Sequence, residues 1–63
     1  MEKRLRNGEM IELTNGVDCV TIWFQEKTNN FCLELNAKVI MATKSFAPIR
    51  GKMHDIGNLN ETI

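Results

Sequence analysis

Three apolar runs, separated by short polar segments, constrain the fold of this 63-residue chain more than any other feature. The run Val17–Phe24 is rich in β-branched and aromatic residues, which favour strands. The runs Phe31–Leu35 and Val39–Thr43 show the alternation of a half-buried strand. We interpret residues 26–29 and 36–38, which separate the three runs, as hairpin loops. The pattern predicts an antiparallel meander.

Two further strands are expected before these runs. Asn15-Gly16 predicts a two-residue turn, because a type I′ turn needs positive φ at both central positions. This turn would join a strand over Met10–Leu13 to the one that begins at Val17. Asn7-Gly8 is a second turn or bulge signal, and it would separate a short first strand around Lys3–Arg6. The sequence therefore predicts five short antiparallel strands.

The registers of these hairpins can be tested by parity, because successive side chains of a strand point to opposite faces. A loop over residues 26–29 brings the apolar residues of the first two runs onto one face. The next loop then places Leu35 opposite Val39, and the Asn-Gly turn places Ile11 opposite Val20. One wholly apolar face results, formed by Ile11, Val20, Ile22, Phe24, Phe31, Leu33, Leu35, Val39 and Met41.

A meander with one apolar face must be covered by another layer. A chain this short buries only about 60% of its unfolded surface, so disulfides, metals or a second chain usually assist it. Pro48, Gly51 and Gly57 disfavour a long amphipathic helix that could serve as the cover. We therefore expect an all-β domain over residues 1–52, covered by a second copy, and a short helical or disordered tail over residues 53–63.

The eight basic and eight acidic residues balance, but they are unevenly distributed. Residues 1–6 and 38–52 are mainly basic, whereas the segment 9–34 is mainly acidic. If the two basic segments meet in the fold, they form a basic patch. Such a patch holds phosphates, and the unpaired groups of a strand edge can contact RNA bases.

Several other functions find little support in the sequence. His54 is the single histidine, and the chain has no glycine-rich phosphate loop and no metal-binding cysteine spacing, so we expect neither an enzyme nor a metal or other cofactor. Cys19 and Cys32 fall on predicted strands, and in the predicted register Trp23 rather than Cys19 lies opposite Cys32. No segment approaches the ~20 apolar residues of a membrane span and the N-terminus lacks a signal-peptide core, so we expect a cytoplasmic protein.

Three segments, LRNGEMIEL, VDCVTIWF and NNFCLELNAKVIMATKS, together resemble the carbon storage regulator family of bacterial RNA-binding translational repressors. The resemblance covers residues 4–46. The short first strand of that family corresponds to Leu5-Arg6, and its Asn-Ala pair corresponds to Asn36-Ala37. Lys38 stands where the family has proline, and Ser45 aligns with an arginine that contacts RNA.

The resemblance implies an interlocked homodimeric β-sandwich or barrel, in which the first strand of one chain lies beside the last strand of the other. It implies binding to single-stranded GGA-type loops in messenger leaders, with repression of translation or altered message stability, and leaves room for a protein antagonist. The RNA-binding residues expected on this basis are Arg4, Leu5, Arg6, Asn36, Ala37, Lys38, Ala42, Thr43, Lys44 and Ser45.

Two other interpretations remain open at this point. The chain could be a small protein-interaction module, an anti-regulator or phage-type inhibitor, that acts through its β surface without binding RNA. It could also be a small β-barrel of the Sm or SH3 type, which the segment NGVDCVTIWF would suit. Trp23 is compatible with stacking on a nucleic-acid base and with packing at a dimer contact.

Overall fold

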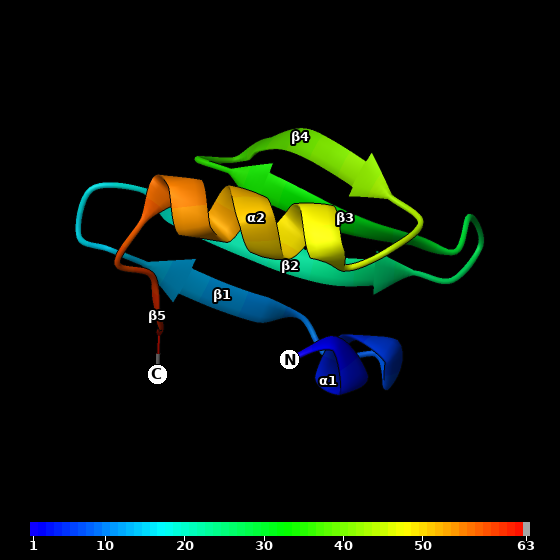
Figure 1. The fold of residues 1–63 in the computed structure, drawn as a ribbon. Helices are drawn as coiled ribbons and strands as arrows, with labels where there is room; N and C mark the ends of the chain where they lie inside the picture. Colours follow the sequence, from blue (N-terminus) through cyan, green and yellow to red (C-terminus); the bar gives the residue numbers. More distant parts are fainter. Residues whose placement is uncertain (63) are drawn as a thin grey trace.

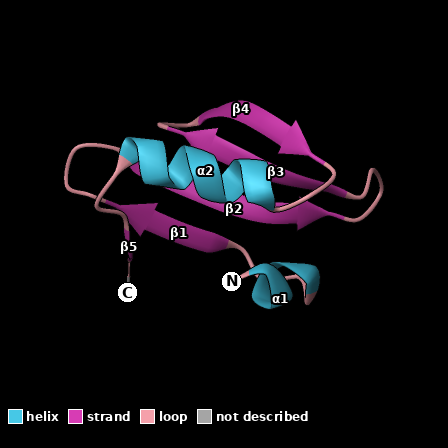
Figure 2. Ribbon diagram, in the orientation of Figure 1, coloured by secondary structure: helices cyan, strands magenta, loops and turns pink. Residues whose placement is uncertain are grey.

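The computed structural model describes residues 1–62, which form one antiparallel sheet and two helices (Figures 1 and 2). The sheet has the strand order β4-β3-β2-β1-β5. In chain order the elements are α1 (Glu2–Arg6), β1 (Ile11–Thr14), β2 (Cys19–Gln25), β3 (Asn30–Leu35), β4 (Lys38–Thr43), α2 (Ala47–Ile56) and β5 (Asn60–Glu61). The prediction of five antiparallel strands is confirmed, although the strand expected at the start of the chain is replaced by one at residues 60–61.

The central hairpin of β2 and β3 has the predicted register. Phe24 pairs with Phe31, and the loop over residues 26–29 has the predicted four residues. Trp23 lies opposite Cys32, as expected, and both cysteines are free. Parity therefore assigned the two faces of this hairpin correctly.

The connection between β1 and β2 is longer than predicted. The side chain of Asn15 accepts hydrogen bonds from the backbone N–H groups of Val17 (2.9 Å) and Asp18 (2.7 Å), which makes a four-residue connection over residues 15–18. Ile11 consequently pairs with Ile22, so the predicted pairing with Val20 is wrong. Because the register shifts by two residues, the alternation of faces is preserved and Ile11 is still buried.

The turn between β3 and β4 contains two residues, Asn36 and Ala37, where we expected three. The shorter turn pairs Lys38 with Leu35 and so places Val39 opposite Glu34 instead of Leu35. A shift of one residue turns a side chain to the other face, so Val39 is 53% exposed and its predicted place on the apolar face is wrong. A bulge at Ile40 then restores the predicted pairing of Met41 with Leu33.

Replacing Ala37 with glycine is expected to stabilise the protein. Ala37 has a φ of 70°, a conformation that costs a residue with a Cβ about 1–2 kcal/mol. Allowing for the entropy that glycine loses, we expect Ala37→Gly to raise the free energy of unfolding by about 0.5–1 kcal/mol in urea denaturation. Ala42→Gly, in the middle of β4, is the control and should lower it. Destabilisation by both substitutions would contradict the assigned turn.

Residues 2–6 form the helix α1, so the predicted first strand is wrong. The helix ends in a Schellman motif. Gly8 has a φ of 92°, and its N–H donates to the carbonyl oxygen of Leu5 (3.0 Å), while the N–H of Glu9 donates to that of Arg4 (3.1 Å). Gly8 is thus a helix stop rather than a hairpin turn, and the helix is held to the sheet by the fully buried Leu5.

Helix α2 covers the apolar face of the sheet, where we expected a second copy of the chain (Figure 1). Pro48, counted above against a helix, lies in the first turn, where its missing N–H breaks no helical hydrogen bond. Ile49 is fully buried against the sheet. The expectation of only a short helical tail is wrong, and the expected boundary between residues 52 and 53 falls inside α2. Residue 63, the last of the expected tail, lies outside the described residues.

The hydrophobic core lies between the sheet and the two helices. Its buried members are Leu5, Ile11, Leu13, Val20, Ile22, Phe31, Leu33, Phe46 and Ile49. One chain therefore buries, fully or in part, the apolar face that parity predicted except for Val39. None of the helices in the described part of the chain is long and apolar enough to cross a membrane.

Candidate functional site

The expected RNA-binding residues lie at three places in the structure. Asn36 and Ala37 form the turn between β3 and β4 and Lys38 begins β4, whereas residues 42–45 lie at the opposite end of β4. At about 3.3 Å per residue, about 13 Å of extended chain separates Lys38 from Ala42. The third group, residues 4–6, belongs to α1.

Asn36 has a structural role in the turn that it occupies. Its Oδ1 accepts a hydrogen bond from the N–H of Cys19 (2.9 Å), and its Nδ2 donates to Oδ1 of Asp18 (3.0 Å). Its own backbone N–H donates to the carbonyl oxygen of Cys19 (2.8 Å). These bonds tie the β3–β4 turn to the start of β2, so the polar atoms of this side chain are already occupied.

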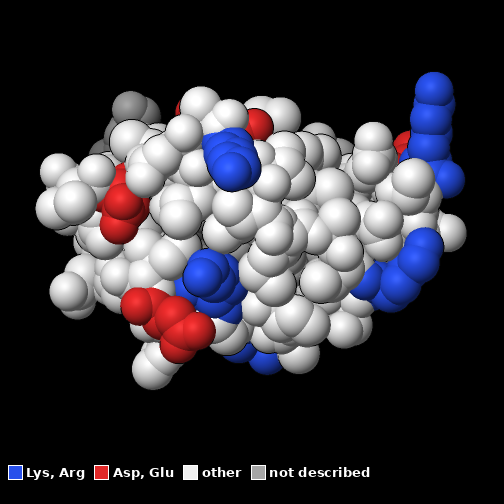
Figure 3. Space-filling model, turned by 90° about the horizontal axis from the view of Figure 1, so that it is seen from above, with Lys and Arg blue, Asp and Glu red and all other residues white. Residues whose placement is uncertain are grey.

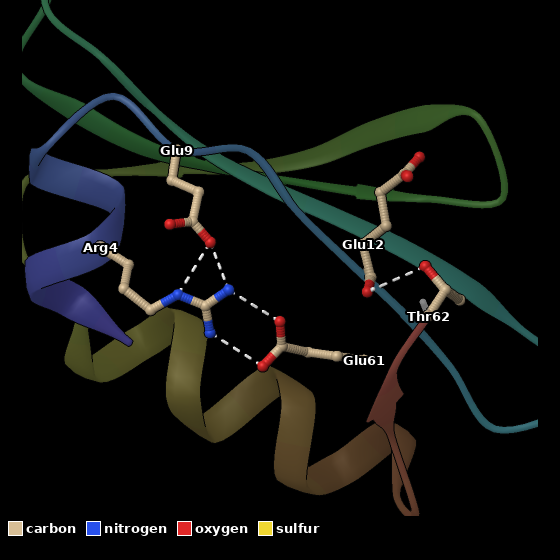
Figure 4. Close-up of polar contacts among 5 residues, drawn as sticks. All are labelled: Arg4, Glu9, Glu12, Glu61 and Thr62. Atoms are coloured by element: carbon tan, nitrogen blue, oxygen red, sulfur yellow. Dashed lines mark hydrogen bonds and ion pairs between the residues drawn. The ribbon is translucent and has the colours of Figure 1, made fainter.

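Arg4 is neutralised by two carboxylates that lie far apart in the sequence (Figure 4). Its guanidinium donates to both carboxylate oxygens of Glu61 at 2.8 Å, and its Nε donates to Glu9 at 2.8 Å. Next to this cluster the N–H of Thr62 donates to the carbonyl oxygen of Glu12 (3.0 Å). Arg4 therefore joins α1 to the segment that pairs with β1, and its charge is not free for a ligand.

The contact with Arg4 makes the pairing of β5 with β1 sensitive to acid. The hydrogen bond from Arg4 holds the pKa of Glu61 below its ordinary value. A carboxylate whose pKa is lowered in the folded state adds stability above its ordinary pKa, about 4.3, and loses it as the pH falls through the lower folded-state pKa.

We expect the amide NMR signals of residues 60–62 to move together as the pH is lowered through this range, because Glu61 loses its bond to Arg4 when it is protonated. In the Glu61→Gln control, which removes the titrating group, this movement should be absent. An Arg4→Ala variant in which Glu61 still titrates below its ordinary range would contradict the assigned cause.

The remaining arginine of α1, Arg6, lies over aromatic rings at one end of the sheet. Its guanidinium carbon is 4.9 Å from the ring centroid of Phe31 and 5.3 Å from that of Phe24, and its Nε lies 3.3 Å from a carboxylate oxygen of Glu2. Phe31 is the register partner of Thr43 at the end of β4. The single chain therefore brings Arg6 close to the expected residues that follow Thr43.

Three more cations lie at this end of the molecule. Arg50, in the first turns of α2, lies 5.2 Å above the ring of Phe46, which packs edge-on against Phe31 at 5.6 Å. Lys44 donates through Nζ to the carbonyl oxygen of Thr28 in the β2–β3 loop. Lys27 is the adjacent residue of that loop. We call the set Arg6, Lys27, Lys44 and Arg50 the basic end.

Charged side chains are unevenly distributed over the face drawn in Figure 3. The acidic residues in the segments of the basic end are Glu2, which pairs with Arg6, and Glu26 in the loop. Figure 3 shows blue groups at the end of the molecule where Figure 1 has the β2–β3 loop, and larger red groups toward the other end. An open depression lined by Glu2, Lys3, Arg6 and Asn7 adjoins the basic end through Arg6.

Two observations concern metal binding and thiol chemistry in the described part of the chain. Among residues 1–62, no group of three or more His, Cys, Asp or Glu side chains is placed to hold a metal ion. Burial raises the pKa of the Cys32 thiol, which disfavours the thiolate that a nucleophile needs. Leu5, expected among the RNA-binding residues, is fully buried in the core.

Comparison of the chain with family models, curated proteins and solved structures gave no match in any of the three. Function is therefore inferred from this chain's own geometry. Two members of the basic end were absent from the expected site. Arg50 could have been found, because it belongs to the basic segment 38–52. Lys27 could not, because it is a single basic residue in the mainly acidic segment 9–34.

Proposed function

We propose that this chain binds single-stranded RNA through its basic end and thereby regulates translation or message stability. The observation that carries the proposal is the convergence of four cations from four segments: α1, the β2–β3 loop, the end of β4 and the start of α2. Lysine and arginine side chains neutralise phosphates and release counterions, which drives binding to nucleic acids. Guanidinium groups also stack on unpaired bases.

The start of α2 adds to the positive potential of this end. Its first turn contains no acidic residue, and no side chain caps its free N–H groups. The amino end of a helix carries a partial positive charge and binds phosphate oxygens readily. Arg50 and Lys44 lie on either side of this turn in the sequence, so phosphate contacts from backbone and side chains would fall together.

A homodimer, which the family resemblance implies, is a separate part of the proposal. An interlocked dimer of that family's kind places the first strand of one chain beside the last strand of the other. Residues 3–6 are helical here, so such a dimer would require α1 to become a strand. The basic end is complete within one chain, and RNA binding is therefore proposed for the chain in either oligomeric state.

The deciding experiment is a titration of labelled RNA hairpins with the purified protein at several salt concentrations. One hairpin carries GGA in its loop, and the other carries the same loop nucleotides scrambled. The Arg6→Ala, Lys44→Ala double variant should bind at least about tenfold more weakly than the parent chain. Its salt slope should fall by about 1.4, because each contact to a single-stranded phosphate contributes about 0.7.

The matched control is Lys38→Ala, Lys52→Ala, which removes the same net charge from positions outside the basic end. It should bind as the parent does. Equal losses in both double variants would mean that charge alone matters, and the assigned site would be wrong. Failure of the parent chain to bind either hairpin at low salt would remove the proposal, while equal binding to both would remove only the GGA preference.

A further inference from the structure

We propose that the free edge of β4 binds an acidic segment of a partner protein, which joins the sheet as an additional strand. Addition of an extended peptide to an exposed sheet edge is a common mode of peptide recognition, in which main-chain hydrogen bonds supply affinity. This inference does not depend on RNA binding. It rests on the topology, exposure and charge of β4, and on what covers the opposite edge.

Strand β4 is an open edge of the sheet. It stands first in the order β4-β3-β2-β1-β5, with β3 as its neighbour, and Figure 1 shows no other described element on its outer side. Its six residues make it long enough to pair with an incoming strand. An edge strand presents a row of unpaired N–H and C=O groups that can serve as a template for another chain.

The same strand exposes apolar side chains. Ile40 is bulged and has no partner on β3, and Val39 lies opposite Glu34 on the face away from the core, so that they are 38% and 53% exposed. Ala42, further along the strand, is exposed as well. Protein edges are normally protected by charged side chains or by a cover, whereas here the middle of the strand is apolar. An incoming strand would find both backbone partners and an apolar surface.

Charge selects an acidic partner over a second copy of this chain. Lys38 and Lys44 stand at the two ends of β4, with no acidic residue between them. Antiparallel pairing of two β4 strands would bring Lys38 of one copy close to Lys44 of the other, and like charges opposite one another destabilise a sheet. A carboxylate near one end of an incoming strand would instead meet Lys38, and one near the other end would meet Lys44, whose Nζ also donates to the carbonyl oxygen of Thr28.

The opposite edge of the sheet already shows this arrangement within the molecule. There the short strand β5 pairs with β1, with Glu61 opposite Leu13, and the carboxylate of Glu61 accepts two hydrogen bonds from Arg4 at 2.8 Å (Figure 4). The N–H of Thr62 adds a further bond to β1. This edge of the sheet is therefore covered by an extended acidic segment, which is held by backbone hydrogen bonds and by a neighbouring cation. At β4 the edge and the cations are present and the described chain supplies no cover.

The expected partner segment can be stated in chemical terms. It is extended over about six residues, because Lys38 and Lys44 are separated by roughly 20 Å along the strand. Alternate positions carry Val, Ile or Thr, which pack against Val39 and Ile40. A Glu or Asp stands near each end.

Three fluorescein-labelled synthetic peptides test the inference with the full chain. The first alternates Val and Thr over six residues between terminal Glu residues, the second has Lys at both ends, and the third is the first with a central Pro. Fluorescence anisotropy should give at least about tenfold tighter binding of the Glu peptide than of either other peptide. Backbone amide NMR signals should change along residues 38–44.

The paired variants are Val39→Glu and Val17→Glu, both at exposed apolar side chains, with Val17 86% exposed in the β1–β2 connection. Val39→Glu should weaken binding of the Glu peptide about tenfold, because it removes apolar contact and adds a like charge, and Val17→Glu should leave it unchanged. Equal binding of the Glu and Lys peptides, or NMR changes at β1 instead of β4, would overturn the inference. So would sedimentation showing a dimer of the free chain that Val39→Glu dissociates, because a second copy would then be the occupant.

Discussion

Replacing Phe31 with alanine is expected to lower the free energy of unfolding by about 3–5 kcal/mol. The ring of Phe31 is fully buried, with ring centroids of Phe24 and Phe46 at 4.9 and 5.6 Å and the guanidinium of Arg6 above it. At about 0.05–0.15 kcal/mol per residue, a chain of this size has roughly 3–9 kcal/mol in total. Phe31→Ala should therefore remove about a third or more of the total stability.

Urea denaturation followed by the fluorescence of the single tryptophan, Trp23, and by circular dichroism measures this effect. Phe31→Leu is the control, because it keeps most of the apolar volume and should cost clearly less. A loss below about 1 kcal/mol for Phe31→Ala would show that the site collapses around the deletion or that the ring is not central to the core. Because Arg6 lies over this ring, the variant also removes one support of the basic end.

Replacing Leu5 with alanine is expected to cost about 2–5 kcal/mol, as for other fully buried leucines. The helix α1 has only five residues, too few to be stable in isolation, so its burial against the core is what keeps it folded. Alanine favours the helix itself, so a loss of stability would report the lost packing.

Lys3→Ala is the matched control for this substitution, because Lys3 is exposed on the same helix and alanine there should change stability by no more than about 0.5 kcal/mol. Urea denaturation of both variants gives the comparison. If Leu5→Ala lowered the free energy of unfolding no more than Lys3→Ala, residues 2–6 would not be packed against the core as described. The assignment of Arg6 to the basic end would then be unsupported.

The strands were predictable because their side chains alternate between two faces, and an error of two residues in a turn leaves each side chain on the same face. The β1–β2 register was wrong by two residues, yet Ile11 still reached the core, since an even shift preserves the face. The position of Val39 was not predictable, because a turn one residue shorter than expected moves Val39 to the other face before a bulge at Ile40 restores the register. Turn length depended on local hydrogen bonds of Asn15, which no hydrophobic pattern reveals.

The helices were missed for a different reason. Pro48 and Gly8 were interpreted as helix breakers or hairpin signals, whereas they stand at the start of one helix and just after the end of another. In a short segment, a proline or glycine is compatible with a turn and with a helix end. Burial of Leu5 and Ile49 in the core favours the helix in each case.

The candidate site was only partly predictable, because charge patterning indicated that two basic segments meet but not which side chains remain free. Arg6 and Lys44 do lie at the same end of the sheet. Arg4, the neighbour expected to act with them, is instead bound by Glu61, which is 57 residues away in the sequence. A contact between such distant exposed residues leaves no local signal.

The order of the elements along the chain also sets the order in which the protein can fold. Strands β1 to β4 are joined by short connections and can form as soon as they are synthesised, since neighbouring segments meet quickly. Their apolar face, however, has no cover until residues 47–56 have left the ribosome and α2 can dock. During that interval the nascent chain presents an unprotected sheet of the kind that aggregates or recruits chaperones. The delay between the emergence of β4 and that of residues 47–56 thus determines how long that exposure lasts.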